Sequence, residues 1–125
     1  MPTTDSRQFL GKLGEDLACE ELRRHGYSIL ATRRRTRFGE IDIICERGGA
    51  VAFVEVKARK SAKHGSAAES ITPWKRRRIS AMALDYLASA GRLDSPCSFA
   101  VVAIDGIGSP GMTVRVIDDA WTVDG

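Results

Sequence analysis

Two acidic residues, Asp42 and Glu55, lie within apolar stretches on either side of the pair Gly48-Gly49. A Gly-Gly pair between two such stretches is typical of a two-residue β-hairpin. With Gly48 and Gly49 as the loop, the register places Asp42 directly opposite Glu55, with Cβ atoms about 4.5–5.5 Å apart. The hairpin therefore predicts two carboxylates that face each other in the middle of apolar strands. A one-residue bulge at Gly48 would shift this register.

Facing carboxylates in an apolar setting destabilise a sheet unless something offsets their repulsion. A shared proton, an adjacent cation or a divalent metal would each do so. Two carboxylates, a main-chain carbonyl and several waters suit Mg²⁺, and Lys57 lies two residues beyond Glu55 on the same face of the strand. These groups would suit metal-assisted phosphodiester hydrolysis. The competing interpretation is an edge strand with solvated charges, in which Asp42 and Glu40 form an ion-pair ladder with Lys57.

The middle of the chain is strongly basic. Residues 23–78 hold 15 Lys and Arg residues against 5 Asp and Glu, although the whole chain has a formal net charge of only +3. This concentration of charge predicts a surface for a polyanion, with a solvated Arg-rich surface as the alternative. The candidate nucleic-acid contacts are Arg33, Arg34, Arg35, Arg37, Arg59, Lys75, Arg76, Arg77 and Arg78.

The basic run from Lys75 to Arg78 lies where a helix is expected to begin, just after Thr72-Pro73. The helix macrodipole disfavours cations at this end, so helix stability does not explain them. Backbone N–H groups and four cations at a helix start form a phosphate-binding surface; a solvated helix end is the alternative. Tyr27 or Phe38 could stack on bases beside the arginines, although such residues are more often part of a core.

Two helices are expected from periodicity and capping signals. The first begins at a capping box of Asp5 and Gln8 and ends at Gly26. The second begins with Thr72 as its N-cap and stops near Gly91.

Strands account for most of the remaining chain. Residues 33–37 are expected to be a basic link, and residues 60–71 a mobile loop that contains His64. The order of elements is therefore α-β-β-β-α-β-β. The expected strands are residues 27–31, 40–46, 50–59, 99–104 and 113–117.

The composition fits a single domain over residues 1–125. No apolar stretch approaches the ~18 residues of a membrane span, so we expect no membrane association. Cys19, Cys45 and Cys97 are odd in number and widely spaced. This spacing favours a reducing compartment, the cytoplasm, over a disulfide scaffold or a zinc site.

These residues carry a family resemblance. Gly39-Glu40-Ile41-Asp42, followed by Glu55-Val56-Lys57, resembles the D…(D/E)-x-K core of the restriction-endonuclease-like, or PD-(D/E)xK, nuclease superfamily. Over residues 10–105 the chain more closely resembles the bacterial YraN-like family. The matching segments are Gly11-x-x-Gly14-Glu15 with Ala18, Arg37 to Asp42, Phe53 to Lys57 with Arg59, Gly65, and Thr72-Pro73-x-Lys75.

The resemblance implies an α/β fold with a restriction-endonuclease-like αβββαβ core, in which helices flank a mixed central sheet. It also implies Mg²⁺- or Mn²⁺-dependent DNA cleavage. In that scheme Asp42 and Glu55 are metal ligands, Lys57 is the catalytic lysine, and Glu15 is an auxiliary catalytic acid from the first helix. Taken alone, Glu15 could equally be a solvated acid of that helix. The chain departs from the family at Arg33, where asparagine is common.

We therefore predict a cytoplasmic Mg²⁺- or Mn²⁺-dependent nuclease that acts on DNA, branched and single-stranded forms included, with RNA as a second candidate. One domain of this size offers little surface for base readout, which favours structure-selective or weakly specific binding. A homodimer with two sites facing one substrate is common in the superfamily. Two alternatives stay open: a non-catalytic nucleic-acid-binding module of the same fold, and a basic protein-interaction domain.

Overall fold

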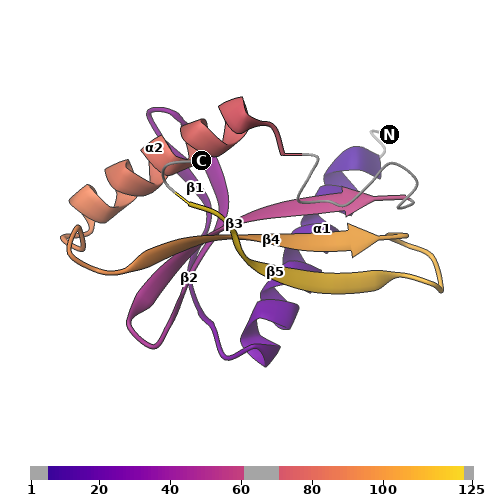
Figure 1. The fold of residues 1–125 in the computed structure, drawn as a ribbon. Coiled ribbons are helices and arrows are strands. Elements are labelled where there is room, and N and C mark those ends of the chain that lie inside the picture. Colours follow the sequence, from indigo (N-terminus) through magenta and orange to yellow (C-terminus); the bar gives the residue numbers. More distant parts are fainter. Residues whose placement is uncertain (1–5, 61–70, 123–125) are drawn as a thin grey trace.

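The computed structural model describes residues 6–60 and 71–122. These residues form a five-stranded sheet with a helix on each face (Figure 1). The predicted order α-β-β-β-α-β-β is confirmed, and the α/β architecture is consistent with a restriction-endonuclease-like αβββαβ core. The elements are α1 (Ser6–Arg24), β1 (Ser28–Thr36), β2 (Gly39–Arg47), β3 (Ala50–Arg59), α2 (Pro73–Ser89), β4 (Cys97–Asp105) and β5 (Thr113–Trp121).

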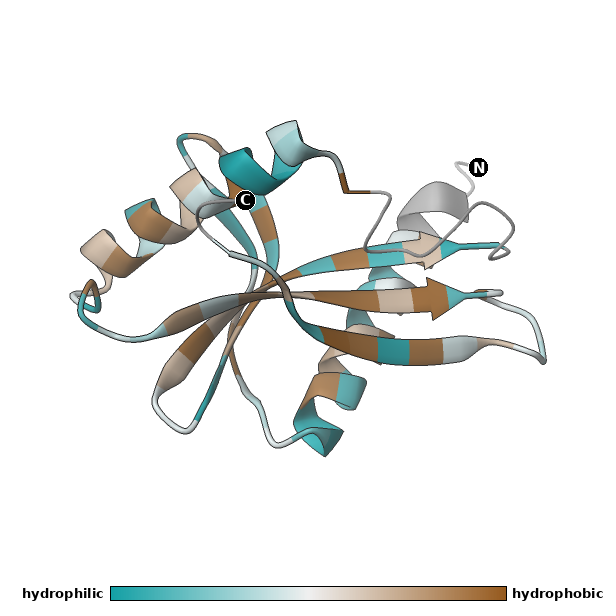
Figure 2. Cartoon of the chain, viewed as in Figure 1, coloured by the Kyte–Doolittle hydropathy of each residue, from teal (hydrophilic) through white to brown (hydrophobic). Residues whose placement is uncertain are grey.

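The sheet is mixed, with the strand order β1-β2-β3-β4-β5. Neighbouring strands are antiparallel except β3 and β4, which are parallel because α2 connects them and returns the chain to the same end of the sheet. The central strands are strongly hydrophobic (Figure 2), and their side chains fill two cores. The core under α1 includes Leu22, Val54 and Val102, and the core under α2 includes Phe53 and Met82.

The first strand is longer than predicted, because β1 takes in most of residues 33–37, the expected basic link. Arg35 pairs with Glu40 in the ladder between β1 and β2. Backbone hydrogen bonds hold these arginines in a strand, and β1 is an edge strand whose charged side chains can reach water. As a consequence, Glu40 forms its ion pair with Arg35, at 3.7 Å, rather than with Lys57.

The helix boundaries follow the predicted caps. Gly26, two residues after the end of α1, has φ +88°, as expected for a residue that terminates a helix in the left-handed conformation. At the start of α2, the Thr72 hydroxyl accepts a hydrogen bond from the amide of Lys75 at 3.1 Å. The predicted Asp5 cap and the predicted loop around His64 lie outside the described residues.

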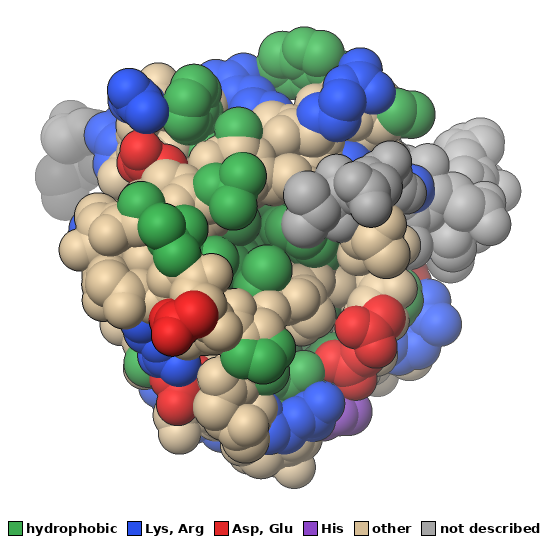
Figure 3. All heavy atoms as spheres, turned by 60° about the vertical axis from the view of Figure 1, so that its left-hand side comes forward, with side chains coloured by type: hydrophobic (Ala, Val, Ile, Leu, Met, Phe, Trp, Pro, Cys, Tyr) green, Lys and Arg blue, Asp and Glu red, His purple; other side chains and the backbone are tan. Residues whose placement is uncertain are grey.

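α2 packs mainly over β1 and β2. Figure 3 shows hydrophobic side chains gathered towards the middle of one face of the molecule, with charged side chains of both signs around them. None of the helices in the described part of the chain is long and apolar enough to cross a membrane.

Replacing Gly39 by alanine is expected to destabilise the turn between β1 and β2. Gly39 has φ +136°, and a Cβ there would lie 3.2 Å from Arg78 and 3.4 Å from Met82. The free energy of unfolding, measured with urea, should fall by at least about 1 kcal/mol. In the control, Gly11→Ala, the new Cβ has open space around it, and alanine in a helix should add about 0.5–1 kcal/mol. Equal stability of Gly39→Ala and the wild type would contradict the prediction.

Candidate active site

The hairpin of β2 and β3 has the predicted register. Gly48 and Gly49 form its loop, with φ of +60° and +80°, as a two-residue hairpin turn requires. The ladder then runs over five residue pairs and ends at Ile43 with Val54. It stops one pair before the position of the two predicted carboxylates.

The side chain of Asp42 takes the place of the next backbone pair of the ladder. Its Oδ2 accepts a hydrogen bond from the backbone amide of Val56 at 2.8 Å. The predicted ladder pair between Asp42 and Glu55 is therefore not formed, because the carboxylate takes a neighbouring backbone donor on β3. Both strands continue beyond this point and diverge (Figure 1). The two acids thus lie where β2 and β3 separate.

The two carboxylates nevertheless interact. Glu55 is only 8% exposed, and Asp42 is partly buried. Burial, and then the nearby Glu55 carboxylate, raise the pKa of Asp42 from its ordinary 3.8 to about 7, whereas the Val56 amide and the Lys75 ammonium lower it. Asp42 therefore releases its proton less readily than an ordinary aspartate, and the pair resists carrying two full negative charges.

The cation beside the pair is Lys75, which the sequence predicted to contact nucleic acid. Its Nζ lies 2.5 Å from Glu55 Oε1. Lys57, the predicted catalytic lysine, is half-buried and forms no hydrogen bond or ion pair with the residues that the structure describes. One signal in the sequence pointed to Lys75, because cations in the first turn of a helix oppose the macrodipole and gain from an acidic partner. The identity of that partner depends on how α2 packs.

Glu15 approaches Asp42 from the α1 side of the sheet. Both residues line one cavity of about 170 Å³. Glu15 Oε2 accepts a hydrogen bond from Arg33 Nε at 2.6 Å, and Arg33 has φ +49°, a conformation in which asparagine is more common. The structure thus brings Glu15 and Asp42 together. The cavity is lined by Leu10, Gly11, Gly14, Glu15, Asp42, Val56 and Ala58.

The candidate nucleic-acid contacts differ in how far the protein's own groups occupy them. Arg33 pairs with Glu15, Arg59 pairs with Asp105 at 3.0 Å, and Arg76 donates to the carbonyl of Ile71 at 3.1 Å. Arg35 and Arg37 also form ion pairs, at 3.7 and 3.5 Å, but their side chains stay largely exposed. The first turns of α2 are strongly hydrophilic (Figure 2). The tip of the β1–β2 hairpin and the outer side of α2 therefore form the exposed basic surface. Its residues are Arg34, Arg35, Arg37, Arg77 and Arg78.

A metal ion at the acidic pair would have few protein ligands. Among residues 6–60 and 71–122, no three His, Cys, Asp or Glu side chains gather as a ligand set. Asp42 and Glu55 supply two carboxylates, and Mg²⁺ usually binds one or two carboxylates and keeps several waters. This donor set fits Mg²⁺ or Mn²⁺ better than Zn²⁺.

Comparison with known proteins gives the family. The pattern of the uncharacterised protein family UPF0102 matches residues 14–104, which include the acidic pair and both lysines. A UPF0102 protein of Symbiobacterium thermophilum is 39% identical over 90% of this chain and 95% of its own length. A UPF0102 protein of Syntrophus aciditrophicus is 45% identical over 89% of this chain and 87% of its own length. A UPF0102 protein of Syntrophomonas wolfei is 44% identical over 76% of this chain and 83% of its own length. The YraN-like resemblance is thereby confirmed, and the chain belongs to the family UPF0102.

Proposed function

We propose that this protein is a divalent-metal-dependent nuclease that hydrolyses phosphodiester bonds of DNA. The observation that carries the proposal is the closeness of Asp42 and Glu55 where β2 and β3 separate, which contributes to raising the pKa of Asp42 to about 7. A bound cation would remove the repulsion between two such carboxylates. The exposed arginines of the β1–β2 hairpin and α2 would attract a polyanionic substrate to that cation.

Each residue of the site has a role in this proposal. Asp42 and Glu55 hold Mg²⁺ or Mn²⁺, which when bound polarises the phosphate and lowers the pKa of a water molecule. Lys75 orients Glu55 through the 2.5 Å contact. Lys57 has no ion pair with a described residue, so it can contact the phosphate and stabilise its developing charge. Glu15 lines the cavity of Asp42 and is placed to hydrogen-bond a water there.

One observation favours a second candidate function, a non-catalytic nucleic-acid-binding module. The Lys75 ammonium already offsets the charge of Glu55, and Arg33 offsets that of Glu15. The site can therefore keep its acids without a metal. In this case the basic surface would bind DNA, and the carboxylates would serve to position α1 and α2 on the sheet.

Cleavage assays on labelled single-stranded, duplex and four-way-junction DNA test the proposal. The wild type should cut at least one of these substrates in Mg²⁺ or Mn²⁺ and none of them in EDTA. Asp42→Asn and Glu55→Gln should each reduce cleavage by at least about 100-fold. Asp94→Asn is the matched control, because Asp94 is an exposed acid away from the site, and it should keep full activity.

The outcomes separate the two candidate functions. Equal cleavage by the wild type and both site variants would mean that a contaminant cuts the DNA, and the nuclease proposal would be abandoned. DNA binding that weakens steeply with salt, without any cleavage, would support the binding module.

A further inference from the structure

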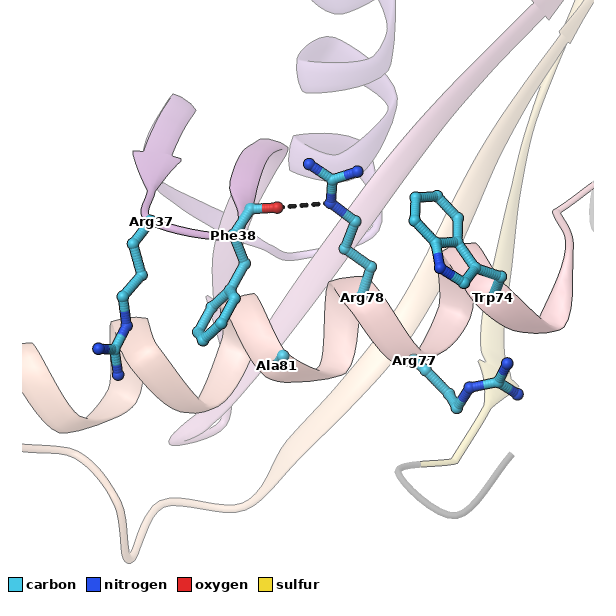
Figure 4. Close-up of a pocket in the computed structure, with 6 residues that line it drawn as sticks. All are labelled: Arg37, Phe38, Trp74, Arg77, Arg78 and Ala81. Atoms are coloured by element: carbon cyan, nitrogen blue, oxygen red, sulfur yellow. Dashed lines mark hydrogen bonds between the residues drawn. The ribbon is translucent and has the colours of Figure 1, made fainter.

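The outer side of α2 and the turn before β2 form an open groove of about 480 Å³. Two aromatic side chains line it: Trp74 is 61% exposed and Phe38 is 39% exposed. Figure 4 shows their rings on either side of Arg78 along the helix, with Ala81 on the helix surface. Single exposed apolar side chains are common, but apolar side chains that gather in one groove rimmed by polar residues often mark a binding site. The exposed rings therefore indicate a ligand surface.

Arg78 contacts both sides of the groove. Arg78 Nε donates to the carbonyl oxygen of Phe38 at 2.5 Å, and the Arg78 guanidinium lies 5.2 Å from the centre of the Trp74 ring. Gly39 permits this close approach, since a Cβ there would lie 3.2 Å from Arg78. The Thr72 cap fixes the first turn of α2, which carries Trp74. The backbone on both sides of the groove is therefore held before a ligand binds, which lowers the entropy cost of binding.

The groove is basic as well as aromatic. Arg37, Arg77 and Arg78 line it, and none of the described residues that line it is acidic. Asp85, which pairs with Arg37 at 3.5 Å, lines the next cavity along α2. Guanidinium groups beside aromatic faces are the combination that binds single-stranded nucleic acid, since cations follow the phosphates and bases stack on the rings. Bases inside a duplex are already stacked and cannot reach such rings.

The groove begins one residue along α2 from the lysine that contacts the acidic pair. Trp74 is the neighbour of Lys75 in the first turn of α2, and Lys75 Nζ lies 2.5 Å from Glu55. A strand whose base stacks on Trp74 would therefore lie at the same turn of α2 that carries Lys75. We infer that this groove binds unstacked bases of single-stranded nucleic acid at the first turns of α2, by stacking on Trp74 and Phe38. As a statement about the substrate, this inference rests on the proposed nuclease function. The binding of a single strand can be tested without cleavage.

Binding in EDTA, where metal-dependent cleavage cannot occur, tests the inference. The probes are labelled oligo-dT, oligo-U and a DNA duplex of the same length, followed by fluorescence anisotropy. The wild type should bind the single strands more tightly than the duplex. Trp74→Ala should bind the single strands roughly 5- to 100-fold more weakly, as expected for the loss of stacking on one base. Trp74→Phe keeps an aromatic face and should stay within about threefold of the wild type.

Leu84→Ala is the matched control, because Leu84 is 51% exposed on the same helix but does not line the groove. The Leu84→Ala protein should bind the single strands and the duplex as the wild type does. Unchanged binding by Trp74→Ala, or equal affinity of the wild type for duplex and single strands, would overturn the inference. So would a loss of self-association in Trp74→Ala with unchanged DNA binding, because the groove would then be an interface between two copies. Single-strand binding as expected, with no cleavage in Mg²⁺ or Mn²⁺, would remove the proposed function and leave this inference standing.

Discussion

Asp42→Asn is expected to stabilise the metal-free protein by up to about 4 kcal/mol near pH 8, where the wild type must hold an ionised Asp42 beside Glu55. Burial and the Glu55 carboxylate raise the pKa of Asp42 from 3.8 to about 7 in the folded protein. Asparagine keeps the shape of the side chain and an oxygen that can accept the Val56 amide, but it has no charge to bury. Thermal and urea unfolding in EDTA measure the difference.

The pH dependence follows from the same shift. Between about pH 4 and pH 7, the folded wild type keeps a proton on Asp42 that the unfolded chain releases. Its free energy of unfolding must therefore fall as the pH rises through this window. Asp42→Asn cannot bind that proton and should lose this part of the slope, whereas the exposed control Asp94→Asn should keep it. A slope that survives in Asp42→Asn would show that another group causes it.

Mg²⁺ or Mn²⁺ should stabilise the wild type and leave Asp42→Asn nearly unchanged. A ligand that binds only the folded state adds about 2.7 kcal/mol of stability at a concentration 100 times its Kd. The effect should be larger near pH 8 than near pH 6, because the cation competes with the proton on Asp42. Equal stabilisation of both proteins would place the cation elsewhere.

Lys57→Ala and Lys75→Ala are expected to differ in their effects. Lys57 has no ion pair with a described residue, so its loss should leave stability nearly unchanged and reduce cleavage by about 10²–10³-fold, a typical cost of removing one group that stabilises transition-state charge. Lys75→Ala would leave the buried Glu55 without its cation. Because Lys75 itself is partly exposed, its loss should lower the free energy of unfolding by about 1–3 kcal/mol.

Unfolding and cleavage measured on the same preparations separate the two lysines. Lys12→Ala removes only an exposed ion pair with Asp16 and should change neither quantity. Mg²⁺ should restore part of the stability of Lys75→Ala, because a bound cation takes over the role of the ammonium group. If instead the Lys57→Ala protein unfolded more easily than the wild type, and the Lys75→Ala protein cleaved DNA more slowly at unchanged stability, the roles of the two lysines would be reversed.

Local signals predicted much of this fold. The Gly48-Gly49 turn, the Thr72 cap and the helix end at Gly26 all depend on residues adjacent in the chain, and the structure has each of them. The length of β1 was not predictable in the same way. Charged residues such as Arg34 and Arg35 have no local preference for a strand, and it is pairing with β2 that holds them in one.

In the candidate site too, local signals predicted one part and tertiary contacts decided the other. The sequence by itself determined that Asp42 and Glu55 would come close, because a two-residue turn leaves an antiparallel hairpin one register. Only the tertiary structure decided that the ladder ends at Asp42 and that Lys75 contacts Glu55. The second contact depends on α2 packing its apolar side, with Ile79, on the sheet. Such packing joins positions that are distant in the chain, and no local pattern encodes which polar side chains then meet.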